Sequence, residues 1–229
     1  MHKLYAFLAV REGCLDEVVD QLEQEAERFA ESSPGTAVTV LRAVNEDPIA
    51  HLYPGMRSHD AVLEFRSEKD VSPILVPRLA DLMTQLGDRI FADLSGAIVA
   101  EENQVAPVPE RDSRYIALMR RKTGFSHDEY VDYYRTTHVR FGRECPGSIG
   151  YHQNYVDRDA SRGAAHASGL GLWDLDSVTE IYIRSAEEFN RATADNPIRE
   201  EAGADEARFI DRRSMVGFCV TVAARAGTC

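Results

Sequence analysis

The predicted elements of this chain occur in one order that repeats, and this repeat constrains the fold more than any other feature of the sequence. In the first half, strands are expected at 4–10, 37–44, 60–67 and 96–100, and helices at 16–30 and 74–91. In the second half, strands are expected at 115–119, 150–156, 178–183 and 215–222, and helices at 126–145 and from 186 to 193. Each half thus reads β-α-β-β-α-β, an α+β pattern typical of a ferredoxin-like unit with both helices on one face of an antiparallel sheet.

A proline-containing segment, VAPVPERDS at 105–113, separates the two halves and predicts domains at 1–105 and 112–229. A sheet that is covered by helices on one face leaves its other face to be buried. We therefore expect the two sheets to meet through these open faces, either as a pseudo-dimer within one chain or across two chains in a homodimer.

Charge and cysteine content exclude several classes of protein. The formal net charge is −12 and no basic run is present, so nucleic acids and anionic membrane surfaces are poor partners. The scattered cysteines, Cys14, Cys145, Cys219 and Cys229, form no C-x-x-C pair and suggest neither a zinc site nor a disulfide framework. The N-terminal apolar run is too short for a signal peptide, and no stretch approaches the roughly 18 apolar residues of a membrane span. We expect a cytoplasmic protein.

The helix at 126–145 has a well-defined start. Ser126 and Glu129 form a capping box, in which each side chain can bond the backbone N–H of the other residue. With the start of the helix known, a rotation of 100° per residue places one apolar stripe on the face that packs against the sheet. This stripe contains Tyr130, Tyr134, His138 and Phe141.

His138 has two interpretations. A histidine on an apolar face usually packs in the core with its ring nitrogens satisfied by a tyrosine or a carbonyl. The following strand, YHQNYV, favours a catalytic role for His138. It places Tyr151 and Gln153 on one face and His152 and Asn154 on the other. A helix and a strand that both present proton-carrying groups to the interior indicate a pocket. Side chains alternate along a strand, so either Tyr151 or His152, but not both, can face the helix.

Several residues near His138 in the predicted fold could share its chemistry. Because the pKa of histidine lies near neutral pH, His138 is the best general acid or base in the chain. Tyr134 could orient it or donate a hydrogen bond to a developing oxyanion. One of Asp205, Glu206 and Asp211 could fix the His138 tautomer, while at least two of the three are expected to be helix-end or surface charges.

Two loops carry weaker signals. Trp173 lies in SGLGLWDLDS, a glycine-rich segment that could form a mobile flap over an apolar ligand. In HLYPGMRSHD, the residues His51, Tyr53, His59 and Asp60 include possible metal ligands. A metal site needs three convergent ligands and this loop pattern is weak, so we expect no metal.

Three segments of the second half resemble the EthD domain, a branch of the dimeric α+β barrel superfamily: RRKTGFSHDEYVDYYRTTHVRF, PGSIGYHQNYV and ADEARFID. The resemblance implies that the tandem units form a dimeric α+β barrel. It also implies that Tyr151, rather than His152, faces His138. The first helix of the first half, DEVVDQLEQEAERFAES, has no histidine. We therefore expect one site per chain, in the second half, and a structural role for 1–105.

The resemblance implies a function as well. Members of the family are typically cofactor-independent and act in ether and aromatic degradation and polyketide tailoring, whereas the superfamily also includes monooxygenases and haem enzymes. We expect a cofactor-independent lyase-type enzyme that dehydrates, decarboxylates, cleaves or cyclises a small apolar aromatic or polyketide-like molecule. The alternatives are a non-catalytic ligand-binding or stress-responsive barrel and a cofactor-free or haem-dependent monooxygenase. The expected catalytic residues are His138, Tyr134 and Tyr151, and the expected pocket lining is Tyr130, Phe141, His152, Gln153, Trp173 and Asp211.

Overall fold

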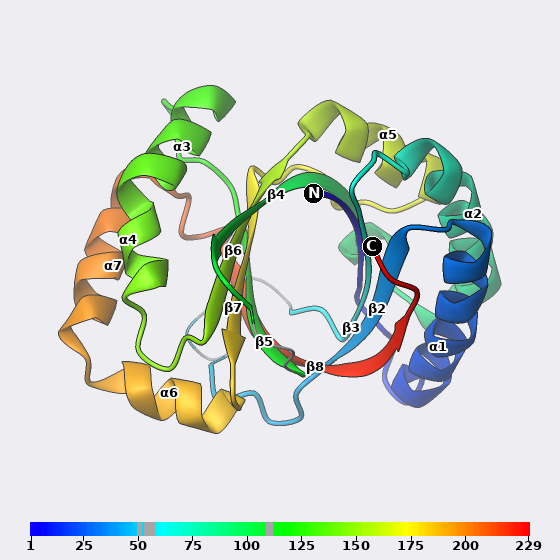
Figure 1. Cartoon of the computed structure of the whole chain (residues 1–229), viewed down its shortest axis with the longest axis horizontal. Coiled ribbons are helices and arrows are strands. Elements are labelled where there is room, and N and C mark those ends of the chain that lie inside the picture. The colour runs from blue at the N-terminus through cyan, green and yellow to red at the C-terminus, as the bar shows by residue number, and fades with distance from the viewer. Residues whose placement is uncertain (50–51, 53–57, 109–111) are drawn as a thin grey trace.

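The structure is a computed structural model that describes residues 1–49, 52, 58–108 and 112–229. Its strands form one closed barrel (Figure 1).

The strands are β1 (His2–Leu8), β2 (Thr36–Ala43), β3 (Ala61–Ser67), β4 (Gly96–Ala106), β5 (Ser113–Met119), β6 (Gly150–Val156), β7 (Ser177–Ile183) and β8 (Val216–Ala226). Around the barrel they follow the order β1-β3-β2-β8-β5-β7-β6-β4. The helices are α1 (Leu15–Ser32), α2 (Ser72–Leu86), α3 (His127–Tyr133), the π-helical turn η4 (Tyr134–His138), α4 (Val139–Arg143), α5 (Arg158–Ser168), α6 (Ala186–Ala194) and α7 (Pro197–Phe209). Short 3-10 turns, η2 (Gly87–Arg89) and η3 (Ala92–Leu94), precede β4.

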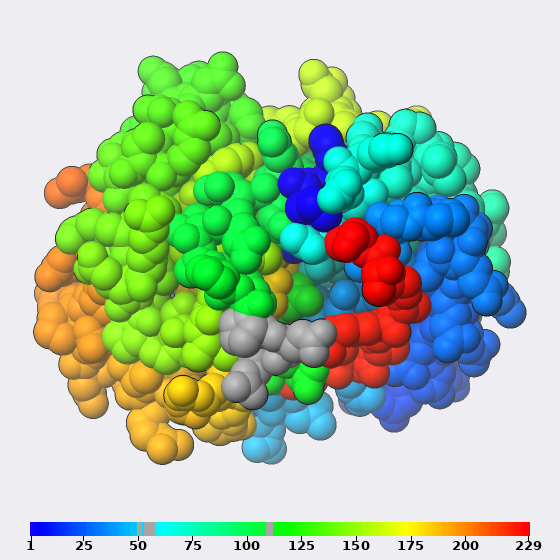
Figure 2. Space-filling view, in the orientation of Figure 1, coloured from blue at the N-terminus to red at the C-terminus, as the bar shows by residue number. Residues whose placement is uncertain are grey.

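Two antiparallel seams join the halves of the chain into the barrel. β2 pairs with β8, where Val38 lies opposite Ala226, and β4 pairs with β6, where Ala100 lies opposite Val156. In Figure 2 the C-terminal strand, in red, accordingly lies against first-half residues in blue. The sheets thus meet within one chain, but they join along their strand edges as well as through their inner faces. Edge pairing satisfies backbone groups that two open sheets would leave exposed.

Apolar clusters lie on both sides of the barrel wall. α1, α2 and α5 cover one outer side, and α3, η4, α4, α6 and α7 cover the other (Figure 1). Alternating strand residues face inwards, where Tyr5, Phe7, Ile116 and Phe218 form part of an apolar cluster inside the barrel. No helix within the described ranges is long and apolar enough to cross a membrane.

Two helices, α5 and α7, were not predicted from the sequence. α5 begins where the Asp157 side chain accepts a hydrogen bond from Ala160 N at 2.9 Å, and it ends at Gly169, which has a left-handed backbone (φ 67°). Its small residues, such as Ala164, suggested a loop because they give little apolar signal. α7 is capped by Asn196 and has Pro197 in its first turn.

The β2–β3 and β6–β7 connections each cross to the opposite half of the barrel. α5, in the second-half connection, packs on β4 and α2, and its Ala164 and Ala165 join the first-half core. The first-half connection sends Ile49 into the second-half core, and the Asp47 carboxylate accepts a hydrogen bond from Cys219 N at 2.6 Å. The outer face of each half is therefore partly covered by the other half.

Candidate functional site

A cavity of about 280 Å³ lies between the outer face of the second-half strands and the helices around them. Strands β5, β6 and β7 supply one wall, and η4, α4, α6 and α7 supply the other. Most of the lining is apolar or aromatic, as in Tyr115, Met119, Phe141, Ile181 and Phe189. The lining residues with ionisable or hydroxyl groups are Tyr115, His138, Cys145, Tyr151, Thr179, Thr193, Arg199, Glu206 and Arg212. Small-molecule sites are usually lined by apolar and aromatic side chains with a limited number of polar groups, and this cavity has that composition.

His138 is paired with a buried carboxylate. Its Nδ1 lies 2.8 Å from Asp205 Oδ2, and the other carboxylate oxygen accepts a hydrogen bond from Tyr133 O–H at 2.7 Å. Burial lowers the pKa of His138 below its ordinary value, and the neighbouring Asp205 only partly opposes this effect. A carboxylate can only accept here, so the neutral ring carries its proton on Nδ1. Nε2 then has its lone pair free and has no hydrogen-bond partner among the described residues.

A π-helical turn sets the position of His138. The capping box is present as predicted, since Ser126 N donates to Glu129 at 2.7 Å and Glu129 N donates to Ser126 at 3.2 Å. α3 then widens into η4 at Tyr134, so the expected continuous helix is interrupted. Tyr134 O accepts a hydrogen bond from the Gln153 side chain at 2.9 Å, which satisfies a carbonyl within the widened turn. Such turns are frequent at functional sites.

A chain of hydroxyl groups continues from the cavity wall into the protein. Gln153 donates to Tyr151 Oη at 2.9 Å, Tyr151 Oη lies 3.5 Å from Tyr134 Oη, and Tyr134 Oη lies 2.5 Å from Thr179 Oγ1. Burial raises the pKa of both tyrosines well above their ordinary value. At neutral pH both phenols are therefore protonated, and Tyr151, which lines the cavity, can donate a hydrogen bond to a ligand.

A carboxyl group and two arginines complete the polar lining. Burial raises the pKa of Glu206 to about 7, and Arg212 opposes this effect only weakly, because its Nε lies 3.8 Å from the carboxylate. No other ion pair or hydrogen bond reaches the Glu206 side chain from the part of the chain that the structure describes. Arg199 lines the same cavity from the first turns of α7.

The structure separates the expected site residues into three groups. His138, Tyr151 and Phe141 line the cavity. Tyr130, Tyr134 and Gln153 lie behind its wall, where Tyr130 Oη bonds Ser177 Oγ at 2.7 Å. Two of these, Tyr130 and Gln153, were expected to line the cavity and do not. The third group also corrects our expectations, because three residues lie elsewhere.

His152, Trp173 and Asp211 do not line the cavity. His152 faces the inside of the barrel, as the alternation along β6 requires once Tyr151 faces the helices. Trp173 packs beside the first-half core and stacks with the Arg162 guanidinium, so it is no flap over this cavity. Asp211 turns back on the following residues and accepts a hydrogen bond from Arg213 N at 3.2 Å.

The sequence interpretation missed most residues from α7 because the helix itself was not recognised. Asp205 was one of three carboxylates considered for the His138 tautomer, and it is the one that the structure places there. Glu206 faces the cavity instead of being a surface charge. In a helix, adjacent residues such as Asp205 and Glu206 point about 100° apart. Their different directions could therefore have been predicted only if the segment had been recognised as a helix.

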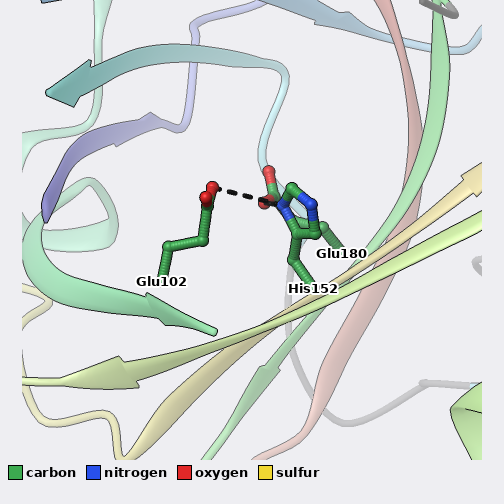
Figure 3. A group of neighbouring side chains, drawn as sticks. All are labelled: Glu102, His152 and Glu180. Carbon is green, nitrogen blue, oxygen red and sulfur yellow. Dashed lines mark ion pairs between the residues drawn. The ribbon is translucent and has the colours of Figure 1, made fainter. Parts of the chain in front are cut away.

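The barrel interior contains a second ionisable group, formed by Glu102, His152 and Glu180 (Figure 3). Their potential ligand atoms lie within 4.8 Å of one another. However, Lys3 Nζ lies 2.5 Å from Glu180 Oε2 and 3.2 Å from Glu102 Oε2, so an ammonium already occupies the space between the carboxylates. Arg114 Nη1 adds a second cation 2.7 Å from Glu180. These contacts describe a charge-compensated ion network inside the barrel rather than a metal centre.

In the first half, two of the residues considered as metal ligands, His59 and Asp60, contact backbone groups. His59 Nε2 lies 3.2 Å from Leu94 O, and the Asp60 carboxylate accepts a hydrogen bond from Val10 N at 2.6 Å. His51 and Tyr53 lie outside the described residues.

Comparison with known proteins confirms the resemblance of the second half to the EthD domain. The sequence profile of the EthD domain matches residues 122–213. This range contains both His138 and Asp205, so the cavity residues that define the site lie largely within the segment that matches the EthD domain. No curated protein matches the chain in sequence.

Solved structures with the same fold are distant in sequence. An anthrone oxidase-like protein is 13% identical, with a TM-score of 0.62 over 98% of this chain and 91% of that chain. A proposed monooxygenase from Lactobacillus acidophilus NCFM is 9% identical, with a TM-score of 0.55 over 99% and 95%. A haem-binding protein from Thermus thermophilus is 12% identical, with a TM-score of 0.51 over 97% and 91%. At these identities the likeness concerns the fold alone.

Proposed function

We propose that this chain, whose second half carries an EthD domain, is an enzyme that uses the His138–Asp205 pair as a general base on a small organic molecule. The different surroundings of the two ring nitrogens carry the proposal. Asp205 holds Nδ1 at 2.8 Å, which leaves Nε2 as the nitrogen available to a ligand in the cavity that His138 lines. A histidine kept neutral by burial can accept a proton at neutral pH.

The proposed reaction begins with removal of a proton from a carbon atom next to a carbonyl group. His138 Nε2 takes the proton, the electron pair moves to the carbonyl oxygen, and Asp205 stabilises the imidazolium that forms. Tyr151 and Thr179, which also line the cavity, supply hydroxyl groups for the developing enolate oxygen. Tyr134 would act as a positioning residue through its 2.5 Å contact with Thr179.

A lyase-type step follows most directly from this enolate. If the substrate carries a β-hydroxyl group, the enolate re-forms the carbonyl and expels the hydroxyl as water. One C–H and one C–O bond break and one C=C bond forms, with no net oxidation, so neither metal nor organic cofactor is required. Glu206 lines the cavity and is partly protonated near neutral pH, so it can give the departing hydroxyl its proton.

A cofactor-independent monooxygenase is the second candidate, favoured by the description of two structural neighbours as oxidase-like and monooxygenase. The first step is the same, but the carbanion reacts with molecular oxygen. A methylene group and O₂ give a carbonyl group and one molecule of water. Molecular oxygen is the oxidant, and the atoms and electrons of this step balance. The two candidates therefore differ only after proton abstraction.

A haem group fits the cavity poorly. His138 could offer Nε2 as an axial ligand, but the cavity volume of about 280 Å³ is at or below the lower end of small-molecule sites, about 300–1,000 Å³. This space suits one or two fused aromatic rings rather than a macrocycle. We therefore derive no step through haem.

Several finer features of the chain belong to the same proposal. We interpret the two halves as tandem ferredoxin-like units, because the strand orders β4-β1-β3-β2 and β8-β5-β7-β6 are equivalent in the two halves. Residues 1–105 would be the structural half and 112–229 the catalytic half. α5 packs on β4 and α2 and adds Ala164 and Ala165 to the first-half core, which is consistent with a structural half.

Solvent-deuterium exchange tests the shared first step without knowledge of the full reaction. The protein is incubated in D₂O with a panel of aromatic ketones, including 2-tetralone and 4-hydroxy-4-phenylbutan-2-one, and exchange is followed by mass spectrometry. Wild type should catalyse exchange above the buffer rate, and His138→Gln should lose about 10²-fold or more of that rate. His166→Gln, a change at an exposed histidine in α5, is the matched control.

The outcomes separate the competing functions. Equal exchange by folded His138→Gln and wild type would refute the catalytic role. Binding of a panel compound without exchange or product by the wild-type protein would instead support a non-catalytic ligand-binding barrel. Formation of an unsaturated ketone without oxygen identifies the lyase step, whereas product that forms only in air identifies the monooxygenase. A Soret band in the purified protein would contradict the cofactor-free assignment.

A further inference from the structure

The cavity opens to the surface beside two arginines. A shallow groove on the outside of the protein is lined by the end of α6 and by α7, and it shares Arg199, Gly203 and Arg212 with the cavity wall. Residues that line both spaces lie at the boundary between them. The mouth of the cavity is therefore flanked by Arg199 and Arg212.

Neither guanidinium group at the mouth is saturated by the protein. Arg199 makes no side-chain hydrogen bond or ion pair with the residues that the structure describes. Arg212 makes two long contacts, from Nη1 to Gly203 O at 3.4 Å and from Nε to Glu206 Oε2 at 3.8 Å. A guanidinium carries five N–H donors, so most of these donors remain available.

The surrounding charge makes these arginines unusual. The chain has 38 acidic and 26 basic residues, and many of its arginines pair with carboxylates, as Arg114 and Arg158 do. Three carboxyl groups, Asp195, Glu200 and Glu206, line the groove or the cavity together with the two arginines. Within the described part of the chain, the ion pair between these carboxyl groups and the two guanidinium groups is the 3.8 Å contact of Arg212 with Glu206, and burial keeps Glu206 partly protonated near neutral pH. The mouth of the cavity thus presents two guanidinium groups without a close carboxylate partner on a protein of net charge −12. Their free N–H donors can bind an anionic group of a ligand directly.

We propose that the cavity takes an aromatic molecule bearing a carboxylate, with the carboxylate held by Arg199 and Arg212 and the ring inside the cavity. The aromatic wall of Tyr115, Phe141 and Phe189 suits the ring, and guanidinium groups bind carboxylates through paired hydrogen bonds. This inference rests on the proposed function in one respect only: the reacting carbon would lie at the inner end, beside His138.

A matched pair of probes tests the inference by binding alone. 2-Naphthoate is anionic and 2-naphthamide is its neutral counterpart, and both are titrated into the protein by calorimetry at pH 7. Wild type should bind the naphthoate about tenfold or more tightly than the amide, the range expected for hydrogen bonds to charged groups. Arg199→Gln and Arg212→Gln should each weaken naphthoate binding several-fold, and the double variant should bind both probes equally.

Two controls make the result specific. Arg213→Gln removes an exposed arginine next in sequence to Arg212 that does not line the cavity, and it should leave both affinities unchanged. His138→Gln should retain the preference for the naphthoate, so loss of catalysis and loss of anion recognition can be told apart. Equal affinity of the two probes for wild type, no binding of naphthoate, or an equal effect of Arg213→Gln and Arg212→Gln would overturn the inference.

Discussion

Replacing Gly142 by alanine tests the packing that shapes the cavity. Gly142 lies in α4, against the ring of Tyr151 from β6. A Cβ atom at this position would lie 2.2 Å from Tyr151 Cε1, 2.4 Å from Cζ and 2.6 Å from Cδ1. The ring is 1% exposed and its hydroxyl is held by Gln153 at 2.9 Å, so it has little freedom to move.

The cost of the substitution follows from this overlap. To restore an ordinary contact of 3.4 Å, the atoms must separate by 3.4 − 2.2 = 1.2 Å. A displacement of this size in a packed core belongs at the upper end of overpacking costs, about 3 kcal/mol. Alanine is more favourable than glycine in a helix by about 1 kcal/mol, which partly offsets this cost. The net loss of unfolding free energy is therefore about 2 kcal/mol. For a chain of this length, the melting temperature should fall by about 4–8 °C.

Thermal unfolding followed by circular dichroism measures this change, and Gly163→Ala is the matched control. Gly163 is an exposed helical glycine in α5 with nothing within 4 Å of a built Cβ atom. Its replacement should raise the melting temperature by about 2–4 °C through helix preference alone. If Gly142→Ala were as stabilising as Gly163→Ala, the close approach of α4 to Tyr151 would be wrong.

Three other measurements address the charges in the protein. Asp205→Asn should lower the pKa of His138 further, because the carboxylate that raises it is lost, and should reduce turnover about 10²-fold or more; an unshifted pH–rate profile would contradict the pairing. In the wild-type protein, turnover should persist below pH 6.5, the ordinary pKa of histidine, and fall only when His138 is protonated at its lower pKa. Lys3→Met should reduce the unfolding free energy in urea by about 3 kcal/mol, since buried Glu180 loses its closest cation and keeps Arg114 with longer contacts to His152 and Asn154. Adding Glu180→Gln to Lys3→Met should recover much of this loss, and a further loss of similar size would argue against their coupling.

Local patterns in the sequence predicted much of the site. The capping box fixed the start of α3, and the helical period then placed Tyr130, Tyr134 and His138 on the buried face. Alternation along β6 separated Tyr151 from His152 before their surroundings were known. These features depend on residues within a few positions of one another, so sequence spacing describes them well.

Other parts of the site depend on contacts that spacing does not describe. The π-helical turn at Tyr134 is stabilised in part by Gln153 from another element, so a helical period cannot reveal it. α7 carries charged residues around much of its surface and few apolar ones, which hid both Asp205 and Glu206 as cavity residues. The position of Arg212 at the mouth becomes visible only when α6 and α7 are placed together.

The crossed connections of the barrel determine how the protein can come apart. Separating 1–105 from 112–229 would open the β2–β8 and β4–β6 seams and strip α5 from the first half and Ile49 from the second. Each fragment would expose two strand edges and part of an apolar core at once. Loss of structure in either half therefore removes support from the cavity, and unfolding should occur as one cooperative event. The half whose first helix has no histidine would thus contribute to the site by keeping it intact.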